Sequence, residues 1–227
     1  MLQERHWYQY GTSMILLIGG EKGGTGKSTV ATNLAVVLAS RGVDVVLLDT
    51  DPQATAARWA ERRNDTDLAT VHCVQRSGSL YEAAKDLATR YQQVIIDAGG
   101  RDSRELRTAM AAADKMYVPL RPSQPDIETS VHLDELVALA CDLNPRLEAR
   151  ALLSMAPTHH SVTEAEDAKE LLSELPHLKL SDVIIRTRKV YRDAMAEGKG
   201  VVELENAKAK SALLALTKEI YSGEVEV

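Results

Sequence analysis

Phenylalanine is absent from this chain of 227 residues, and aromatic residues make up only 4% of it. The core must therefore be built from aliphatic side chains. At 44% hydrophobic residues, the chain has enough apolar material for the core of one α/β domain. The low aromatic content excludes no function.

Cysteine is scarce as well. Cys73 and Cys141 are far apart in the sequence and have no metal-ligand pattern around them, so neither a disulfide framework nor a zinc site is indicated. We expect ordinary buried thiols in a reducing cytoplasm. The pair His159-His160 has no third ligand close in sequence, which favours a surface loop over a metal site.

The chain also lacks a long apolar run and an overall positive charge. No segment approaches the ~18 apolar residues of a membrane span, and the N-terminus has no signal-peptide core, which favours a cytoplasmic protein. Because the net charge is -6, any contact with nucleic acid must come from a local basic patch. Residues 1–13 show no periodicity, so we expect a flexible leader or non-native extension before a single domain at 14–227.

From Met14 onward, short apolar runs alternate with longer helical patterns. Strands are predicted at Met14–Ile18, Val43–Leu48, Val71–Val74, Val94–Asp97, Met116–Leu120, Ala149–Ser154 and Leu178–Ile185. Helices are predicted near 27–41, 54–63, 79–90, 103–112, 126–142, 162–174, 188–197 and 206–221. This alternation predicts an α/β fold with a mainly parallel sheet and helices on both faces.

A glycine-rich segment lies between the first predicted strand and the first predicted helix. That setting is typical of a phosphate-binding loop, in which glycines let backbone N–H groups approach the phosphates at a helix N-terminus. Lys27 should reach the β- and γ-phosphates of ATP, and the Ser28 hydroxyl should bind Mg²⁺. The expected cradle consists of Gly23, Gly24, Thr25, Gly26, Lys27, Ser28 and Thr29.

The loop departs from the strict phosphate-loop pattern in one informative way. Glu21 stands where that pattern has glycine, and Lys22 adds a second lysine, which gives K-G-G-x-G-K-[ST]. This is the deviant Walker A motif, so the chain resembles the ParA/MinD family of P-loop ATPases. The resemblance implies a P-loop NTPase fold, ATP and Mg²⁺ as cofactors, and a role for Lys22 at the phosphates of a partner subunit.

Acidic residues follow two predicted strands at the edge where ligands bind parallel sheets. Asp51 matches the residue that the resembled family uses for hydrolysis, and it could also order the Mg²⁺ shell. Asp49 is either structural or coupled to a switch, and one of this pair could cap a helix. The run ending in Asp97 has the Walker B form, whose acid holds Mg²⁺ through water, although a capping role is the alternative. Glycines follow at 99 and 100, where many family members have proline nearby.

The short length and the DTDPQ sequence most resemble the small ParA-type, ParF-like partition ATPases. The resemblance then implies an ATP-dependent sandwich dimer that binds DNA non-specifically on the nucleoid. A ParB-like or other adaptor would stimulate its hydrolysis, and plasmid or chromosome partition or cargo positioning would be its task. We expect DNA contacts from a dense basic segment containing Arg186, Arg188, Lys189 and Arg192, with Arg188 and Arg192 on one helical face.

Two other functions stay open. A MinD-like ATPase would cycle on membranes through a basic amphipathic C-terminal helix, whereas here the tail closes with acids and packing on the domain is expected. A small-molecule ligase of the dethiobiotin synthetase type would need a carboxylate substrate and no DNA. Trp59, after the acidic turn, is predicted to be either a packing or an interface residue.

Overall fold

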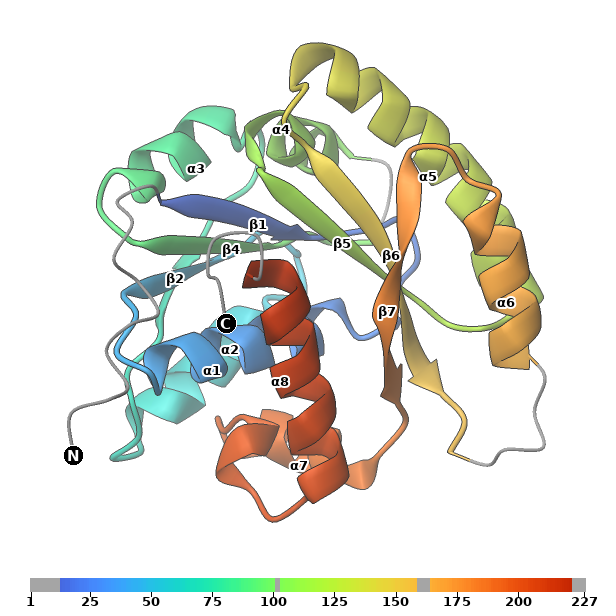
Figure 1. Cartoon of the computed structure of the whole chain (residues 1–227). Helices are drawn as coiled ribbons and strands as arrows, with labels where there is room; N and C mark the ends of the chain where they lie inside the picture. The colour runs from blue at the N-terminus through green and yellow to red at the C-terminus, as the bar shows by residue number, and fades with distance from the viewer. Residues whose placement is uncertain (1–12, 101–102, 159–163, 222–227) are drawn as a thin grey trace.

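The computed structural model describes residues 13–100, 103–158 and 164–221. The described strands form one parallel sheet in the order β3-β2-β4-β1-β5-β6-β7 (Figure 1). They are β1 (Met14–Ile18), β2 (Val45–Asp49), β3 (His72–Gln75), β4 (Gln93–Asp97), β5 (Lys115–Leu120), β6 (Glu148–Ala156) and β7 (Leu178–Arg186).

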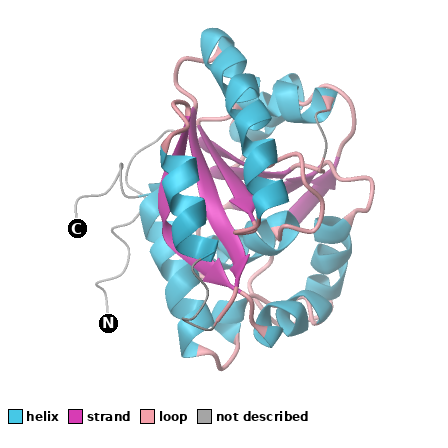
Figure 2. Ribbon diagram, turned by 90° about the vertical axis from the view of Figure 1, so that its right-hand side faces the viewer, coloured by secondary structure: helices cyan, strands magenta, loops and turns pink. Residues whose placement is uncertain are grey.

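Helices cover both faces of the sheet (Figure 2). One face carries α1 (Lys27–Ala39), α2 (Thr55–Asn64), α7 (Lys189–Ala196), the short 3-10 helix η1 (Val201–Glu203) and α8 (Ala207–Tyr221). The other carries α3 (Tyr81–Ala88), α4 (Arg104–Ala112), α5 (Gln124–Leu143) and α6 (Glu164–Ser173). Ile15 and Leu17 of β1 pack on the second group, while Leu16 and Ile18 pack on the first. Because β1 is a central strand buried on both faces, its sequence is an uninterrupted apolar run.

The predicted α/β fold with its parallel sheet is confirmed. Each of the seven predicted strands and eight predicted helices has a counterpart, with ends that differ by a few residues at most. No helix in the described ranges is long and apolar enough to cross a membrane. Residues 1–12 and the pair His159-His160 lie outside the described residues.

The predicted packing of the last helix is confirmed. The apolar face of α8 is buried against the domain through Leu213, Leu216 and Ile220. Cys73 and Cys141 are free and half-buried, and burial raises the pKa of both thiols.

The segment before η1 lies directly against α1. Gly200 is required there, because a Cβ at this position would lie 2.7 Å from a methyl carbon of Val36. The Asn33 side chain links the two elements, since it donates to the Thr29 carbonyl and accepts from the Val201 N–H at 2.7 Å. These contacts fix the first turns of α1, which follow the glycine-rich loop.

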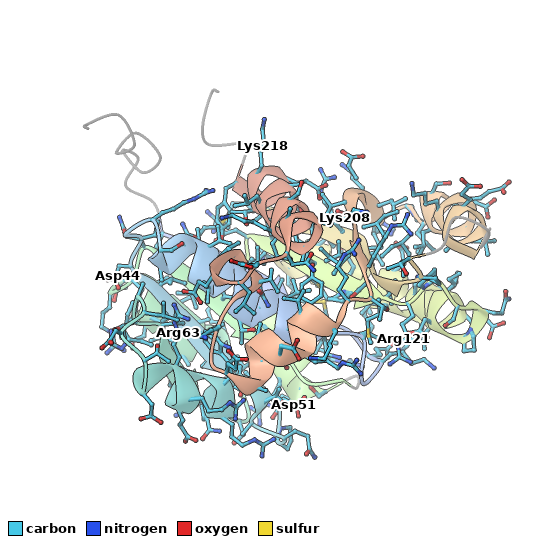
Figure 3. The ribbon with its side chains drawn as sticks, turned by 90° about the horizontal axis from the view of Figure 1, so that it is seen from below. Asp44, Asp51, Arg63, Arg121, Lys208 and Lys218 are labelled. Atoms are coloured by element: carbon cyan, nitrogen blue, oxygen red, sulfur yellow. The ribbon has the colours of Figure 1, made fainter. Side chains whose placement is uncertain are left out.

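Buried polar contacts hold helix α2 against η1 and the segment before it. Trp59 is fully buried and its indole N–H donates to the Lys199 carbonyl, so of the two predicted roles packing is confirmed. The guanidinium of Arg63, also buried (labelled in Figure 3), makes two hydrogen bonds to the Glu203 carboxylate and one each to the Ala69 and Gly198 carbonyls. A buried guanidinium needs this full set of acceptors.

Replacing Glu203 with Ala should lower the free energy of unfolding by about 3 kcal/mol, because it leaves the Arg63 charge buried without its counter-ion. The control is Arg90→Ala, which breaks the exposed Arg90–Asp86 pair and should cost less than about 1 kcal/mol. Urea unfolding of the two variants measures both values. Equal losses would mean that the buried pair does not anchor α2.

Candidate nucleotide-binding site

The glycine-rich loop connects β1 to α1 at the carboxyl edge of the sheet. Gly24 and Gly26 have φ angles of +68° and +93°, a left-handed conformation that disfavours other residues. A Cβ on Gly26 would lie 3.1 Å from the Ser154 hydroxyl at the end of β6, so the loop also packs closely on the sheet. The Thr25 side chain is buried, and its hydroxyl has no hydrogen-bond partner among the described residues.

Side chains from neighbouring elements contact this loop. Arg121, which follows β5, donates to the Gly24 carbonyl. His132 of α5 lies 3.7 Å from the carboxylate of Glu21, the residue that replaces the glycine of the strict motif. Glu21, in place of the usual glycine, thus adds a contact between the loop and α5.

The two lysines of the loop have different surroundings. Lys27 is 6% exposed and its ammonium group donates to the Lys22 carbonyl. Burial lowers the pKa of Lys27, while the charges of Asp97 and Asp51 raise it. Lys22 is half-buried and its side chain makes no ion pair with a residue in the described ranges. Lys27 is therefore directed into the site, whereas the charge of Lys22 is not paired within the described ranges.

The sheet places carboxylates beside the loop. Asp97 pairs in register with Ile18 on one side and with Asp49 on the other, so the last residues of β1, β4 and β2 form one row. Residues that pair in a parallel sheet direct their side chains to the same face. All three thus face the side that carries α1.

Asp97 is almost completely buried at 1% exposure. Neither of its oxygens accepts a well-aligned hydrogen bond from a described residue. Burial raises the pKa of Asp97 to about 7; the Ser28 hydroxyl and Lys27 lower it, while Asp49 and Asp51 raise it. A buried acid of this kind needs a proton or a cation.

Asp49 has a structural role. One of its oxygens accepts from the Asp51 N–H at 3.0 Å and the other from the Ala57 N–H at 2.8 Å, in the first turn of α2. Burial raises the pKa of Asp49, and these two backbone hydrogen bonds lower it. Asp49 therefore joins the first turn of α2, whose N-cap residue is Ala54, to the segment that carries Asp51.

Asp51 lies on this held segment, half-buried. Its carboxylate accepts from the Gln53 N–H at 2.8 Å, and Ala54 closes the turn with a φ of +50°. Gly99 packs beside it, since a Cβ there would lie 3.5 Å from both the Cα and the Cγ of Asp51.

The glycines that follow Asp97 bring three segments together. A Cβ on Gly100 would lie 2.8 Å from the Lys22 carbonyl oxygen, so this residue touches the phosphate loop just as Gly99 touches Asp51. Sequence reasoning noted only that this turn departs from the family pattern. The structure accounts for Gly100 by this close approach to the loop backbone, whereas a Cβ on Gly99 would make only ordinary contacts.

The residues fit a bound Mg²⁺–nucleotide. Ser28, Asp51 and Asp97 supply oxygen ligands of the type that Mg²⁺ prefers. The two oxygens of Asp97 and the hydroxyl of Thr25 are buried without a well-aligned hydrogen bond in the described structure. In the described ranges, no three acidic, histidine or cysteine side chains form a metal site by themselves. That suits Mg²⁺, which takes few protein ligands and fills its shell with phosphate oxygens and water.

An apolar pocket of about 290 Å³ adjoins the loop and extends toward the ends of β6 and β7. We call it the nucleoside pocket. Its lining includes Gly24, Gly26, Thr29, Val30, Ser154, Met155, Ile185, Thr187 and Leu213, together with Arg186, Arg188, Tyr191 and Arg192. Sequence reasoning did not assign Met155 or Ile185 to the site, although their places at strand ends on the ligand-binding edge were a usable signal.

The basic segment does not form the predicted helical face. Helix α7 begins at Lys189, and Arg188 precedes it in an extended conformation with φ -143° and ψ 141°, so Arg188 and Arg192 are not successive positions on one helix. Lys189 pairs with Asp193 at 2.7 Å, and Arg186 donates to the Pro157 carbonyl. The predicted group of four cations is thus divided among different environments.

A family model described as the CobQ/CobB/MinD/ParA nucleotide binding domain matches residues 16–201. The chain belongs to this family of nucleotide-binding proteins. The match spans the loop, both acidic strand ends and the basic segment, which confirms the predicted resemblance.

Named relatives agree with this membership. The chain is 28% identical over 199 residues to the maintenance of carboxysome distribution protein A of Halothiobacillus neapolitanus, covering 87% of this chain and 90% of that protein. It is also 28% identical to the chromosome partitioning protein ParA of Caulobacter vibrioides, covering 92% and 94%. The ATP complex of a Cyanothece McdA variant shares the fold with a TM-score of 0.71 at 18% identity, covering 95% and 98%.

The raised pKa of Asp97 makes stability depend on pH in the nucleotide-free protein. Between about pH 4 and pH 7 this carboxyl is ionised in the unfolded chain but protonated in the folded one, so its contribution to stability should fall as pH rises. Asp97→Asn removes this dependence, and its stability relative to wild type should grow by up to about 1.4 kcal/mol per pH unit over that range. Urea unfolding in EDTA measures it.

The matched control is Asp44→Asn, a change at an exposed aspartate just before β2. It should follow the wild-type pH profile. If Asp97→Asn follows that profile too, Asp97 is ionised in the folded protein at all these pH values and the account of its burial is wrong.

Proposed function

We propose that this protein is a Mg²⁺-dependent ATPase of the ParA type. This proposal rests on the observation that Lys27, Ser28, Asp51 and Asp97 lie together at one loop. Among the described residues, buried Asp97 receives no well-aligned hydrogen bond. The reaction is phosphoryl transfer from ATP to water, which a protein accelerates mainly by positioning and charge stabilisation.

Each residue has a proposed part in this reaction. The backbone of Gly23–Thr29 cradles the phosphates, and Lys27 neutralises charge on the β- and γ-phosphates. Ser28 and Asp97 would hold Mg²⁺, directly or through water, and the bound ion supplies further neutralisation of the phosphates. Asp51 orients the attacking water from a segment that Asp49 keeps in place.

A second subunit completes the proposed active site. Lys22 is half-buried on the loop without an ion pair to a described residue, which supports a role at the phosphates of the partner in an ATP-dependent sandwich dimer. The relatives named for carboxysome distribution and chromosome partitioning support a cycle that positions cargo. In this cycle the ATP dimer binds nucleoid DNA non-specifically, and a ParB-like or other adaptor stimulates hydrolysis and releases it.

The two alternatives have less support. A MinD-like membrane cycle needs an amphipathic helix free to bind lipid, and the apolar side of α8 is occupied by the domain. A ligase of the dethiobiotin synthetase type would require a carboxylate substrate for turnover. Turnover with ATP alone that increases with DNA and an adaptor would separate the proposed function from both alternatives.

Replacing Asp51 with Ala should reduce ATP hydrolysis about a hundredfold or more while ATP affinity stays within a few-fold, because the loop makes the phosphate cradle without this side chain. The variant should then accumulate as an ATP-bound dimer, detectable by light scattering. Gln53→Ala, which changes an exposed side chain on the same turn, is the control and should hydrolyse ATP normally.

Wild-type turnover in Asp51→Ala would overturn the catalytic assignment. A variant that binds ATP without hydrolysis yet stays monomeric would instead contradict the sandwich dimer. The two parts of the proposal can thus fail separately.

A further inference from the structure

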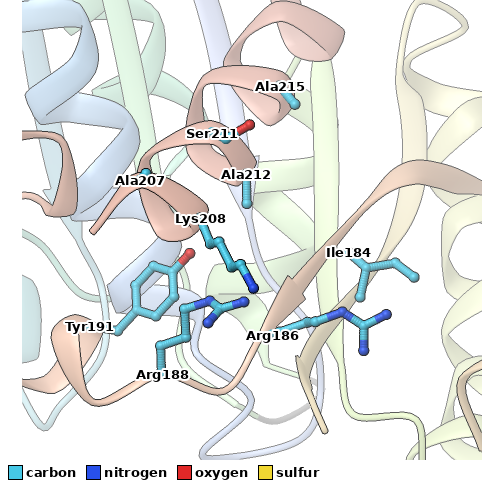
Figure 4. A pocket seen from close by; sticks show the side chains of 9 residues that line it. All are labelled: Ile184, Arg186, Arg188, Tyr191, Ala207, Lys208, Ser211, Ala212 and Ala215. Atoms are coloured by element: carbon cyan, nitrogen blue, oxygen red, sulfur yellow. The ribbon is translucent and has the colours of Figure 1, made fainter. Parts of the chain in front are cut away.

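A second pocket lies on the outer side of β7, next to the nucleoside pocket. Its volume is about 420 Å³ and we call it the β7–α8 pocket (Figure 4). It is lined by Ile184, Arg186, Arg188, Tyr191, Ala207, Lys208, Ser211, Ala212 and Ala215. No acidic residue is part of this lining.

Three cations converge on this pocket from two segments that are distant in sequence. Arg186 and Arg188 come from the end of β7 and the connection to α7, and Lys208 comes from the first turn of α8. The side chains of Arg188 and Lys208 point toward one another across the pocket (Figure 4). Neither forms a hydrogen bond or ion pair with a side chain or carbonyl of the described chain. Like charges placed together repel one another, so the pocket favours an anion between them.

A buried hydroxyl supplies the second observation. Tyr191 is 8% exposed, and its hydroxyl has no hydrogen-bond partner in the described residues. Burial raises the pKa of Tyr191 to about 12, so the hydroxyl keeps its proton and can donate it to an acceptor. In Figure 4 this hydroxyl faces the start of α8. The exposed Ser211 hydroxyl is a further donor in the lining.

The ligand that suits this lining is a phosphate group. It offers several oxygen acceptors and a negative charge to two guanidinium groups, an ammonium group and two hydroxyls. The lining also includes Ala207 and Lys208 in the first turn of α8, where the positive end of the helix dipole favours an anion.

We propose that the β7–α8 pocket binds a phosphate group, and that Lys208 is a cation of this site together with Arg186 and Arg188. This deepens the proposed DNA binding, which it takes as its basis, because the backbone of duplex DNA is the phosphate source that function provides. Two other cations of the basic segment are outside the site. Lys189 is paired with Asp193, and Arg192 lines the nucleoside pocket but not the β7–α8 pocket.

The location also links this site to the nucleotide. Arg186, Arg188 and Tyr191 line both the nucleoside pocket and the β7–α8 pocket. If a nucleotide in the first pocket orders these side chains, it also prepares the phosphate site, and phosphate then strengthens nucleotide binding by the same factor.

The test compares two lysines of α8. Lys208 and Lys210 are both exposed and lie in the first turns of the helix, but only Lys208 lines the pocket. Charge reversal to Glu near a helix N-terminus is compatible with folding, because an acidic side chain interacts favourably with the dipole there. Thermal unfolding of Lys208→Glu and Lys210→Glu checks this.

The first arm measures binding of random-sequence duplex DNA, at several salt concentrations, to protein saturated with a non-hydrolysable ATP analogue. Lys208→Glu should weaken binding about tenfold or more and reduce the salt slope by about 0.9 per subunit, because one phosphate contact is lost. Lys210→Glu should stay within about twofold of wild type. Equal losses in the two variants, or none in Lys208→Glu, would overturn the pocket while leaving DNA binding in place elsewhere.

The second arm titrates inorganic phosphate into the same analogue-saturated protein and follows the Arg188 side-chain NMR signal. Phosphate should shift this signal in wild type and Lys210→Glu but not in Lys208→Glu. If duplex DNA fails to bind wild type while phosphate gives this result, the pocket stands, its ligand is a free phosphate compound, and the DNA part of the proposed function is wrong. If neither ligand binds wild type, the pocket is overturned.

Discussion

The buried carboxylate of Asp97 is the constraint around which the site is arranged. It is held 1% exposed at the end of β4, in register with the last residues of β1 and β2, and no described side chain satisfies it with a well-aligned hydrogen bond. An acid in such surroundings costs stability unless a proton or cation neutralises it. Lys27 and Ser28, at the start of α1, are placed where a Mg²⁺–phosphate group would join all three.

Rigid polar contacts keep the segments around Asp97 in position. Asp49 ties the Asp51 turn to α2, the Arg63–Glu203 pair ties α2 to η1, and Asn33 ties η1 back to α1. These contacts connect the Asp51 turn to α1 through α2 and η1, on one face of the sheet. The two glycines after Asp97 touch Asp51 and the loop, so a shift in one of these segments must be accommodated by the others.

The fold was largely predictable from sequence, because most strands are short apolar runs and the segments between them have helical periodicity. The loop and its acids were predictable as well, since strand ends in a parallel sheet share one edge. The sequence left Asp49 either structural or coupled to a switch, because the hydrogen bonds that give it a structural role, from the Asp51 and Ala57 N–H groups, form only in the fold. Lys208 was missed because only the tertiary fold brings α8 beside Arg188, and the helical face of Arg188 and Arg192 was wrong because α7 begins one residue later.

We propose that Asp97 is buried to serve a bound Mg²⁺–nucleotide. Calorimetric titration of ADP into wild type and Asp97→Asn at pH 8, with and without Mg²⁺, tests this role most directly. We expect Mg²⁺ to tighten ADP binding at least about tenfold in wild type and by less than about twofold in Asp97→Asn. An equal effect of Mg²⁺ on both proteins would contradict the account.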